Sequence, residues 1–223
     1  MLPCEPGGSR SKNNHFRTAR LPARILKIKS EPGGSQSADG ALAKPDIQRH
    51  NTHMTNALTL ILGGARSGKT RYAETLIKAL PQPWAYVATA EIWDQEMAER
   101  IARHQADRSE QGWLTFEAPV EIWHALEGNS PVLVDCLTLW LTNLMLGEHD
   151  IEVALARLEA VLDKRTAPTF LVANEVGLGI VPDNKLARDF RDHAGRLHQR
   201  LAARADRVVL MVAGLPLVVK PSA

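Results

Sequence analysis

The fold of this chain of 223 residues is indicated by one continuous stretch, Leu58-Thr59-Leu60-Ile61-Leu62-Gly63-Gly64-Ala65-Arg66-Ser67-Gly68-Lys69-Thr70. It begins with a short apolar run that stops at two glycines, which is typical of a strand buried on both faces of a parallel sheet. The residues from Gly63 onward match the pattern G-x-x-x-x-G-K-[ST], and helical periodicity follows. A strand, a glycine-rich loop and a helix in this order predict a phosphate-binding loop.

The residue types in this loop suit the binding of phosphate groups. Glycines let successive backbone amides turn toward phosphate oxygens, and the helix N-terminus adds partial positive charge. Lys69 is expected to reach the β- and γ-phosphates as a catalytic residue, and the Thr70 hydroxyl to bind Mg²⁺. The structural alternative is a glycine-rich turn that matches the pattern without binding a nucleotide.

A carboxylate that approaches the same magnesium ion should follow a later apolar strand. Asp135 has that position, directly after Val132-Leu133-Val134. Its alternative role is to cap the next helix. The neighbouring Cys136 is interpreted as a small buried thiol.

From Ala57 onward, apolar runs of strand length alternate with segments of helical periodicity. Strands are predicted at residues 58–62, 84–89, 132–135, 169–172 and 208–212. Helices are predicted at residues 69–80, 94–108, 139–146, 151–164 and 184–203. The turn at Gly214 predicts a C-terminal hairpin in which residues 217–220 fold back. This alternation predicts an α/β fold, a mainly parallel sheet with helices on both faces.

The first 53 residues differ from the rest, and we assign the domain to residues 54–223. They are rich in Gly, Pro, Ser, Arg and Lys, and they carry nine Lys/Arg and four Asp/Glu, a net charge of +5. The segment has too few apolar side chains for their burial to offset the conformational entropy lost on folding. We therefore predict a disordered tail. The alternatives are a basic arm, a targeting peptide, or translation that begins at Met54.

Composition excludes several classes of protein. The longest apolar run, residues 208–219, contains Gly214 and Pro216, whereas a membrane helix needs about 20 apolar residues. We therefore expect no membrane span. Two cysteines are too few for a disulfide framework or a four-cysteine zinc site. Residues 54–223 carry 18 Lys/Arg and 21 Asp/Glu, a mildly acidic balance that argues against nucleic acid as a partner.

The predicted helix over residues 94–108 carries a candidate nucleophile. Arg100, His104 and Arg108 recur every four residues and therefore share one helix face. Two guanidinium groups disfavour protonation of the imidazole and can hold phosphates against it. This arrangement suits attack by histidine on phosphorus. The alternative is a solvated charged face.

Several motifs together resemble the bifunctional adenosylcobinamide kinase / adenosylcobinamide-phosphate guanylyltransferase family. They are the phosphate loop, Tyr86-Val87-Ala88-Thr89-Ala90, Arg100-Ile101 before His104, Asp135-Cys136-Leu137-Thr138-Leu139-Trp140-Leu141-Thr142-Asn143, Asn174-Glu175-Val176-Gly177-Leu178-Gly179-Ile180-Val181-Pro182, and Phe190-Arg191-Asp192 with Gly195-Arg196. The resemblance runs from Leu58 to the C-terminus. It implies a RecA-like P-loop NTPase fold, a homotrimer and a cytoplasmic place in cobalamin biosynthesis.

The resemblance also implies two reactions. Adenosylcobinamide is phosphorylated with ATP or GTP, and GMP is then transferred from GTP, through a guanylylated histidine, to give adenosylcobinamide-GDP. That histidine corresponds to His104, and Mg²⁺ is the expected cofactor at Thr70 and Asp135. The family's nucleotide contacts correspond to Gly63, Gly64, Ala65, Arg66, Ser67, Gly68, Lys69, Thr70, Thr89, Ala90, Glu91, Gln105, Ala106, Asp107, Arg108, Glu117 and Asp135.

The chain departs from the family's pattern at two places. The spacing between Arg108 and Trp113 is one residue longer, which affects the register of Glu117. His198 stands where the family commonly has asparagine. The segment Asn174–Gly177 follows a strand at the edge where α/β sheets bind ligands; its alternative is a connecting turn with positive φ at Gly177 and Gly179.

Two other functions stay open at this point. One is a P-loop kinase of another small alcohol, which would lack the guanylyl transfer. The other is a nucleotide-dependent switch that hydrolyses ATP or GTP without a small-molecule acceptor.

Overall fold

The structure is a computed structural model that describes residues 57–91 and 111–222. Seven strands form in these residues: β1 (Leu58–Gly63), β2 (Trp84–Ala88), β3 (Trp113–Glu117), β4 (Val132–Asp135), β5 (Thr169–Asn174), β6 (Arg207–Val212) and β7 (Leu215–Lys220). The helices described are α1 (Lys69–Ile77), α3 (Ile122–Ala125), α4 (Leu137–Leu146), α5 (Ile151–Leu162) and α6 (Lys185–Arg204). The predicted tail and the predicted helix over residues 94–108 lie outside the described residues.

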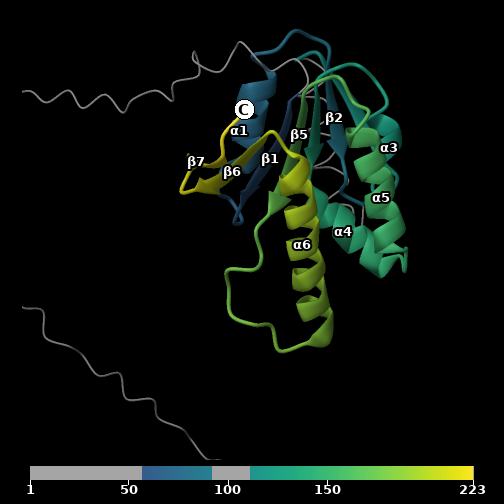
Figure 1. Cartoon of the computed structure of the whole chain (residues 1–223), viewed down its shortest axis with the longest axis vertical. Coiled ribbons are helices and arrows are strands. Elements are labelled where there is room, and N and C mark those ends of the chain that lie inside the picture. The colour runs from purple at the N-terminus through teal and green to yellow at the C-terminus, as the bar shows by residue number, and fades with distance from the viewer. Residues whose placement is uncertain (1–56, 92–110, 223) are drawn as a thin grey trace, which may run out of the picture. The chain divides into compact units, whose positions relative to one another are not determined.

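The strands form one sheet in the order β3-β2-β4-β5-β1-β6-β7 (Figure 1). Neighbouring strands are parallel except β6 and β7, which pair antiparallel. The predicted mainly parallel sheet and C-terminal hairpin are confirmed. One strand, β5, separates the phosphate-loop strand β1 from β4, the strand that ends at Asp135.

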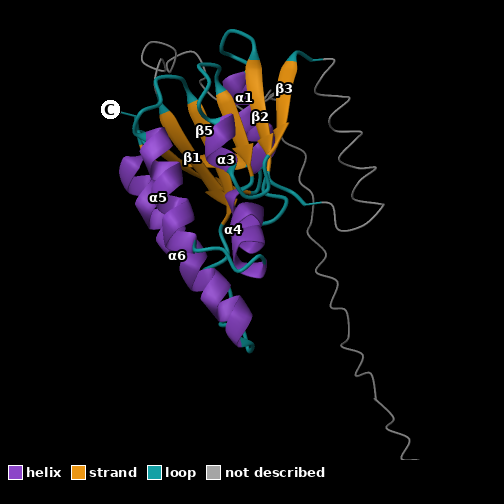
Figure 2. Cartoon of the chain, turned by 90° about the vertical axis from the view of Figure 1, so that its right-hand side faces the viewer, coloured by secondary structure: helices purple, strands orange, loops and turns teal. Residues whose placement is uncertain are grey.

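Helices cover both faces of the sheet, as predicted (Figures 1 and 2). Successive residues of β1 contribute to different cores because side chains alternate across a strand. Ile61 packs in the core that contains Ala73 and Ile77 of α1. Leu60 packs in the core beneath α3, α4, α5 and α6. Burial on both faces explains why β1 reads as a continuous apolar run. Among the described helices, none has the length and hydropathy needed to cross a bilayer.

Two elements in the described residues, β3 and α3, were not predicted. Among the described strands β3 is at the edge and pairs only with β2, and Leu114 and Phe116 are 48% and 42% exposed. Its apolar and polar residues therefore follow neither the continuous pattern of a central strand nor a clear alternation. α3 has only four residues, too few to show helical periodicity.

The predicted end of the first helix was wrong by three residues. α1 ends at Ile77 rather than Leu80. The amides of Ala79 and Leu80 donate to carbonyls three residues back, so the chain tightens before Pro81. The other ends agree with the predictions within two residues, the usual uncertainty of helix and strand boundaries.

Candidate active site

The phosphate loop, residues 63–70, joins β1 to α1 and depends on glycine at two positions. Gly63 has φ +153°, and a Cβ at this residue would lie 2.7 Å from the Met211 carbonyl oxygen and 2.7 Å from Ser67 Oγ. Gly68 is the N-cap of α1 and has a left-handed φ of +92°. Glycine adopts such angles at little cost. The loop therefore has the strand–loop–helix context that the motif requires.

Lys69 lies across the phosphate loop. Its Nζ donates to the Gly64 carbonyl oxygen at 2.6 Å and lies 3.5 Å from Ser67 Oγ. The residue is buried, and this burial lowers the pKa of the ammonium group. Gly64, Ala65 and Arg66, at the tip of the loop, are exposed. A positive charge thus lies inside a loop whose outer residues face solvent.

Thr70 and Asp135 meet at the end of the sheet, as the sequence predicted. Thr70 Oγ1 donates to Asp135 Oδ2 at 2.9 Å, and the Tyr86 hydroxyl donates to the same oxygen at 2.9 Å. The alternative role for Asp135 does not hold, because the N-cap of α4 is Cys136 and no side chain caps that helix end. Cys136 is a buried free thiol, as interpreted. Tyr86 was not predicted as a site residue; its place on a central strand concealed its contact with Asp135.

Thr89 links β2 to the turn after β4. Its hydroxyl donates to the Cys136 carbonyl and accepts from the Cys136 amide, both at 2.8 Å. Its carbonyl accepts from Asn143 Nδ2 at 2.7 Å. Thr89 is fully buried, whereas Ala90 and Glu91 are half-buried. Thr89 therefore fixes the chain from which Ala90 and Glu91 extend.

Glu117 ends β3, where it is paired with Ala88 of β2, and it is exposed. Because β2, β3 and β4 are parallel, Glu117 lies at the same edge of the sheet as Asp135. The other half of the predicted site lies outside the described residues. It comprises Arg100, His104, Gln105, Ala106, Asp107 and Arg108.

A further acidic residue lies beside the phosphate loop. Glu175 follows β5, and its amide donates to the Gly63 carbonyl oxygen at 3.0 Å. Its carboxylate lies 3.5 Å from Nδ1 of the buried His198. Gly177 and Gly179 do not have positive φ, so that part of the alternative was wrong, although the segment does connect β5 to α6. In the sequence, the position of Glu175 directly after a predicted strand indicated that it lies at the ligand-binding edge of the sheet. No sequence pattern indicated its contact with His198.

Potential metal ligands are few in the part of the chain that the structure describes. No group of three or more His, Cys, Asp or Glu side chains gathers there in a way that could hold a metal ion. A hydroxyl and a carboxylate oxygen, from Thr70 and Asp135, do meet beside the phosphate loop. These are the hard oxygen ligands that Mg²⁺ prefers, together with phosphate oxygens of a nucleotide.

Comparison with known proteins agrees with this geometry. The family model "Cobinamide kinase / cobinamide phosphate guanyltransferase" matches residues 59–219. The bifunctional adenosylcobalamin biosynthesis protein CobP of Pseudomonas aeruginosa is 46% identical over 168 residues, which are 72% of this chain and 96% of that protein. The corresponding protein CobU of Salmonella typhimurium is 43% identical over 182 residues, 73% of this chain and 99% of that protein.

Among solved structures, the flagellar accessory protein FlaH of Methanocaldococcus jannaschii is similar with a TM-score of 0.47 and 11% identity, over 79% of this chain and 84% of that one. The match to the family is supported by much higher sequence identity, 46% and 43% for the two relatives against 11% for FlaH. It runs from β1 to β7 and includes the phosphate loop, Asp135 and the segment around His104. The chain therefore belongs to the cobinamide kinase / cobinamide phosphate guanyltransferase family.

Proposed function

We propose that this chain catalyses two successive steps of adenosylcobalamin biosynthesis. It phosphorylates the aminopropanol hydroxyl of adenosylcobinamide with ATP or GTP. It then transfers GMP from GTP to the product, which gives adenosylcobinamide-GDP and pyrophosphate. One observation carries this proposal: a complete phosphate loop with a hydrogen-bonded Thr70–Asp135 pair, in a chain whose residues 59–219 match the family model.

In the kinase step the acceptor oxygen bonds to the γ-phosphorus, and the electron pair of the broken P–O bond leaves on the nucleoside diphosphate. Negative charge spreads over the transferred group, so positioning and charge compensation provide most of the catalysis. Lys69 supplies a fixed positive charge inside the loop, 2.6 Å from the Gly64 carbonyl oxygen. Backbone amides of residues 63–70 hold the phosphate oxygens.

Thr70 and Asp135 are the residues that would hold Mg²⁺ at this site. The fit rests on their oxygens, which lie 2.9 Å apart at the start of α1. When bound, the ion would neutralise negative charge on the β- and γ-phosphates. The Tyr86 hydroxyl, bonded to the same carboxylate oxygen at 2.9 Å, keeps Asp135 oriented toward Thr70.

In the guanylyl transfer, a ring nitrogen of His104 attacks the α-phosphorus of GTP and pyrophosphate leaves. A phosphate oxygen of adenosylcobinamide phosphate then attacks the same phosphorus, and the imidazole is released. The neutral imidazole is the nucleophile. We assign Arg100 and Arg108 to holding the phosphates and to disfavouring protonation of His104.

The remaining predicted residues are proposed as nucleotide contacts on the same edge of the sheet. They are the phosphate loop, Thr89, Ala90, Glu91, Gln105, Ala106, Asp107 and Glu117. Glu91 comes three residues after the end of β2, and Glu117 is the last residue of the neighbouring strand β3. From the family resemblance we further propose a homotrimer in the cytoplasm. The family match does not favour a kinase of another alcohol or a hydrolytic switch.

GTP labelled at the α-phosphate tests this function directly. The wild-type protein should retain the label covalently and release it, as labelled adenosylcobinamide-GDP, when adenosylcobinamide phosphate is added. His104→Ala should lose this covalent label by more than the roughly 10²–10⁴-fold typical of a lost general acid or base, because the covalent route disappears. It should still phosphorylate adenosylcobinamide at a substantial fraction of the wild-type rate. A covalent guanylyl adduct on His104→Ala would mean that another residue is the nucleophile.

A further inference from the structure

Glu175 begins the segment that lies next to the phosphate loop. β5 pairs with β1 so that Asn174 is opposite Gly63, the first residue of the loop. The Glu175 amide donates to the Gly63 carbonyl oxygen at 3.0 Å. On the other side, the Asn174 amide donates to Thr138 Oγ1 at 2.6 Å. The backbone at Glu175 is therefore fixed both to the phosphate loop and to α4.

The carboxylate of Glu175 is also held in place. Its Oε1 accepts from the Gly177 amide at 2.6 Å, and its Oε2 lies 3.5 Å from His198 Nδ1. The side chain of Glu175 is 21% exposed, and that of His198 is 9% exposed. Gly177 leaves room for this arrangement, because a Cβ there would lie 2.9 Å from Oε1. The carboxylate is thus oriented by Gly177 and His198 and is partly exposed.

His198 is the buried neighbour of this carboxylate, with Nδ1 3.5 Å from Oε2. Burial lowers the pKa of His198, and the Glu175 carboxylate only partly opposes this effect. A neutral imidazole has one N–H donor and one acceptor nitrogen. The tautomer with the proton on Nδ1 directs that proton toward Glu175 Oε2, 3.5 Å away. His198 is therefore a positioning residue, which reaches the site only through Glu175.

Other carboxylates that follow strands at this edge are less suited to meet an acceptor at the γ-phosphate. Neighbouring strands lie about 4.8 Å apart, so Glu91 after β2 and Glu117 on β3 are about 14 and 19 Å across the sheet from β1. Asp135 already accepts from Thr70 and Tyr86. Glu175 follows the strand directly beside β1.

We propose that Glu175 is the general base of the phosphoryl transfer, held in position by His198. Its carboxylate accepts the proton of the acceptor hydroxyl while that oxygen bonds to the γ-phosphorus and the β,γ-bridging bond breaks toward the nucleoside diphosphate. The proton then leaves to solvent from the exposed side of the carboxylate. This assignment rests on the proposed kinase function.

Glu175→Gln is the direct test, because the amide keeps the size of the side chain and removes the basic oxygen. The kinase kcat, measured with γ-labelled ATP and adenosylcobinamide, should fall by about 10²–10³-fold. The KM for ATP should stay near the wild-type value. Covalent labelling from α-labelled GTP should stay within about threefold of the wild-type level, because only the general base of the kinase step is lost. This labelling also shows that the variant is folded and binds nucleotide.

Two further comparisons separate a base from a structural residue. In Glu175→Ala, added formate should raise the kinase kcat at least about tenfold, as expected when an external base replaces the carboxylate, whereas chloride at equal ionic strength should not. His198→Asn keeps an N–H donor and should keep most of the kinase kcat. His198→Leu has no donor and should lose about tenfold in kcat with an unchanged KM, since only the orientation of the base is affected.

The outcomes that would overturn the assignment are distinct. A kinase kcat of Glu175→Gln within about threefold of wild type would show that no base is needed at this position. Equal loss of kinase activity and covalent guanylylation, without formate rescue, would give Glu175 a structural role instead. A wild-type protein that labels with GTP but does not phosphorylate adenosylcobinamide would contradict the kinase function itself and overturn both proposals.

Discussion

At the scale of single residues, Lys69 supplies the positive charge nearest the proposed phosphoryl transfer. Lys69→Ala should lower the kinase kcat by about 10²–10³-fold, because the charge that develops on the phosphoryl group loses a fixed partner. Transfer of label from γ-labelled ATP to adenosylcobinamide measures this loss. Lys164→Ala, at an exposed position after α5, is the matched control and should behave like wild type. Near-wild-type phosphorylation by Lys69→Ala would contradict the assignment of the loop.

His198 gives a second prediction at this scale, on the pH dependence of stability. Burial lowers its pKa in the folded state from the ordinary value of 6.5. The unfolded chain therefore binds the proton more readily, so the contribution to stability is complete above pH 6.5 and is lost as the pH falls below it. Urea unfolding should show a smaller loss of the free energy of unfolding between about pH 7 and 5 in His198→Asn than in wild type.

The control for this measurement is His149→Asn, which alters an exposed histidine. Its pH dependence should match that of the wild-type protein. If His198→Asn also matches the wild type, the buried imidazole does not contribute to the acid sensitivity of the fold.

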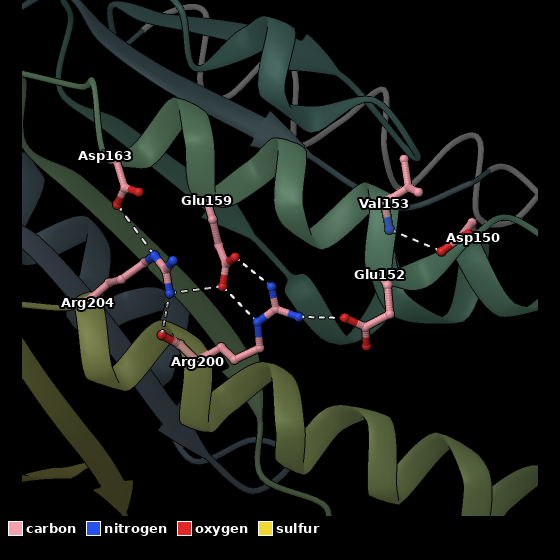
Figure 3. A network of polar contacts seen from close by, with 7 residues as sticks. All are labelled: Asp150, Glu152, Val153, Glu159, Asp163, Arg200 and Arg204. Carbon is pink, nitrogen blue, oxygen red and sulfur yellow. Dashed lines mark hydrogen bonds and ion pairs between the residues drawn. The ribbon is translucent and has the colours of Figure 1, made fainter.

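At the scale of elements, helices α5 and α6 are joined by a polar network (Figure 3). Glu159 has a buried carboxylate that accepts from Arg200 Nε and Nη2 at 2.8 and 2.6 Å and lies 3.0 Å from Arg204 Nη1. Arg200 also contacts Glu152 at 2.7 Å, and Arg204 contacts Asp163 at 3.4 Å. Glu159 is the centre of the network, because both arginines meet at its carboxylate.

This arrangement predicts unequal effects for two glutamates on the same helix. Glu159→Ala leaves both arginines without their buried partner and should lower the free energy of unfolding by about 3 kcal/mol, the low end for a broken buried ion pair because both arginines are partly exposed. Glu152 has a side chain that is 68% exposed, so Glu152→Ala should cost less than about 1 kcal/mol. Urea unfolding of both variants at one pH measures the difference. Similar losses would show that burial of Glu159 adds nothing to the network.

The burial of a strand determines whether it could be predicted from the sequence. β1, β4 and β5 are covered on both faces, so their apolar runs are continuous and were identified from the sequence. β3 has one neighbouring strand and exposes Leu114 and Phe116. Because some of its side chains face solvent, β3 lacks the continuous apolar run that marks a central strand. β7 is also an exposed edge strand, and it was predicted from the turn at Gly214 rather than from its burial.

At the scale of the whole molecule, the parallel sheet determines which parts of the candidate site can be predicted from the sequence. The phosphate loop is contiguous, and Thr70 meets Asp135 because parallel strands end at one edge, so both were predictable. The contact between Glu175 and His198 depends on where α6 crosses the end of β5. No local pattern encodes such a crossing, because it results from the packing of α6 on the sheet.

The first residues of β1 and the residue before it are tied into the sheet. Ala57 is buried, and its carbonyl accepts from the Thr169 amide at 3.0 Å. The Leu58 amide donates to Asp206 Oδ2 at 2.7 Å. These contacts join the start of β1 to the start of β5 and to the residue before β6. Residues 57 and 58 thus belong to the sheet, and a truncation that removes them cuts into its two central pairings.

Two truncations that differ at this boundary test whether the predicted tail contributes to function. A chain that starts at Met54 keeps both contacts and loses nine Lys/Arg and four Asp/Glu. It should keep both activities and unfold within about 0.5 kcal/mol of the full chain, as surface changes usually do. A chain that starts at Thr59 loses the contacts of Ala57 and Leu58 and should unfold at lower urea concentration. If the Met54 variant lost either activity with its circular dichroism and unfolding midpoint unchanged, the basic segment would take part in catalysis, and the domain would have to be extended to include it.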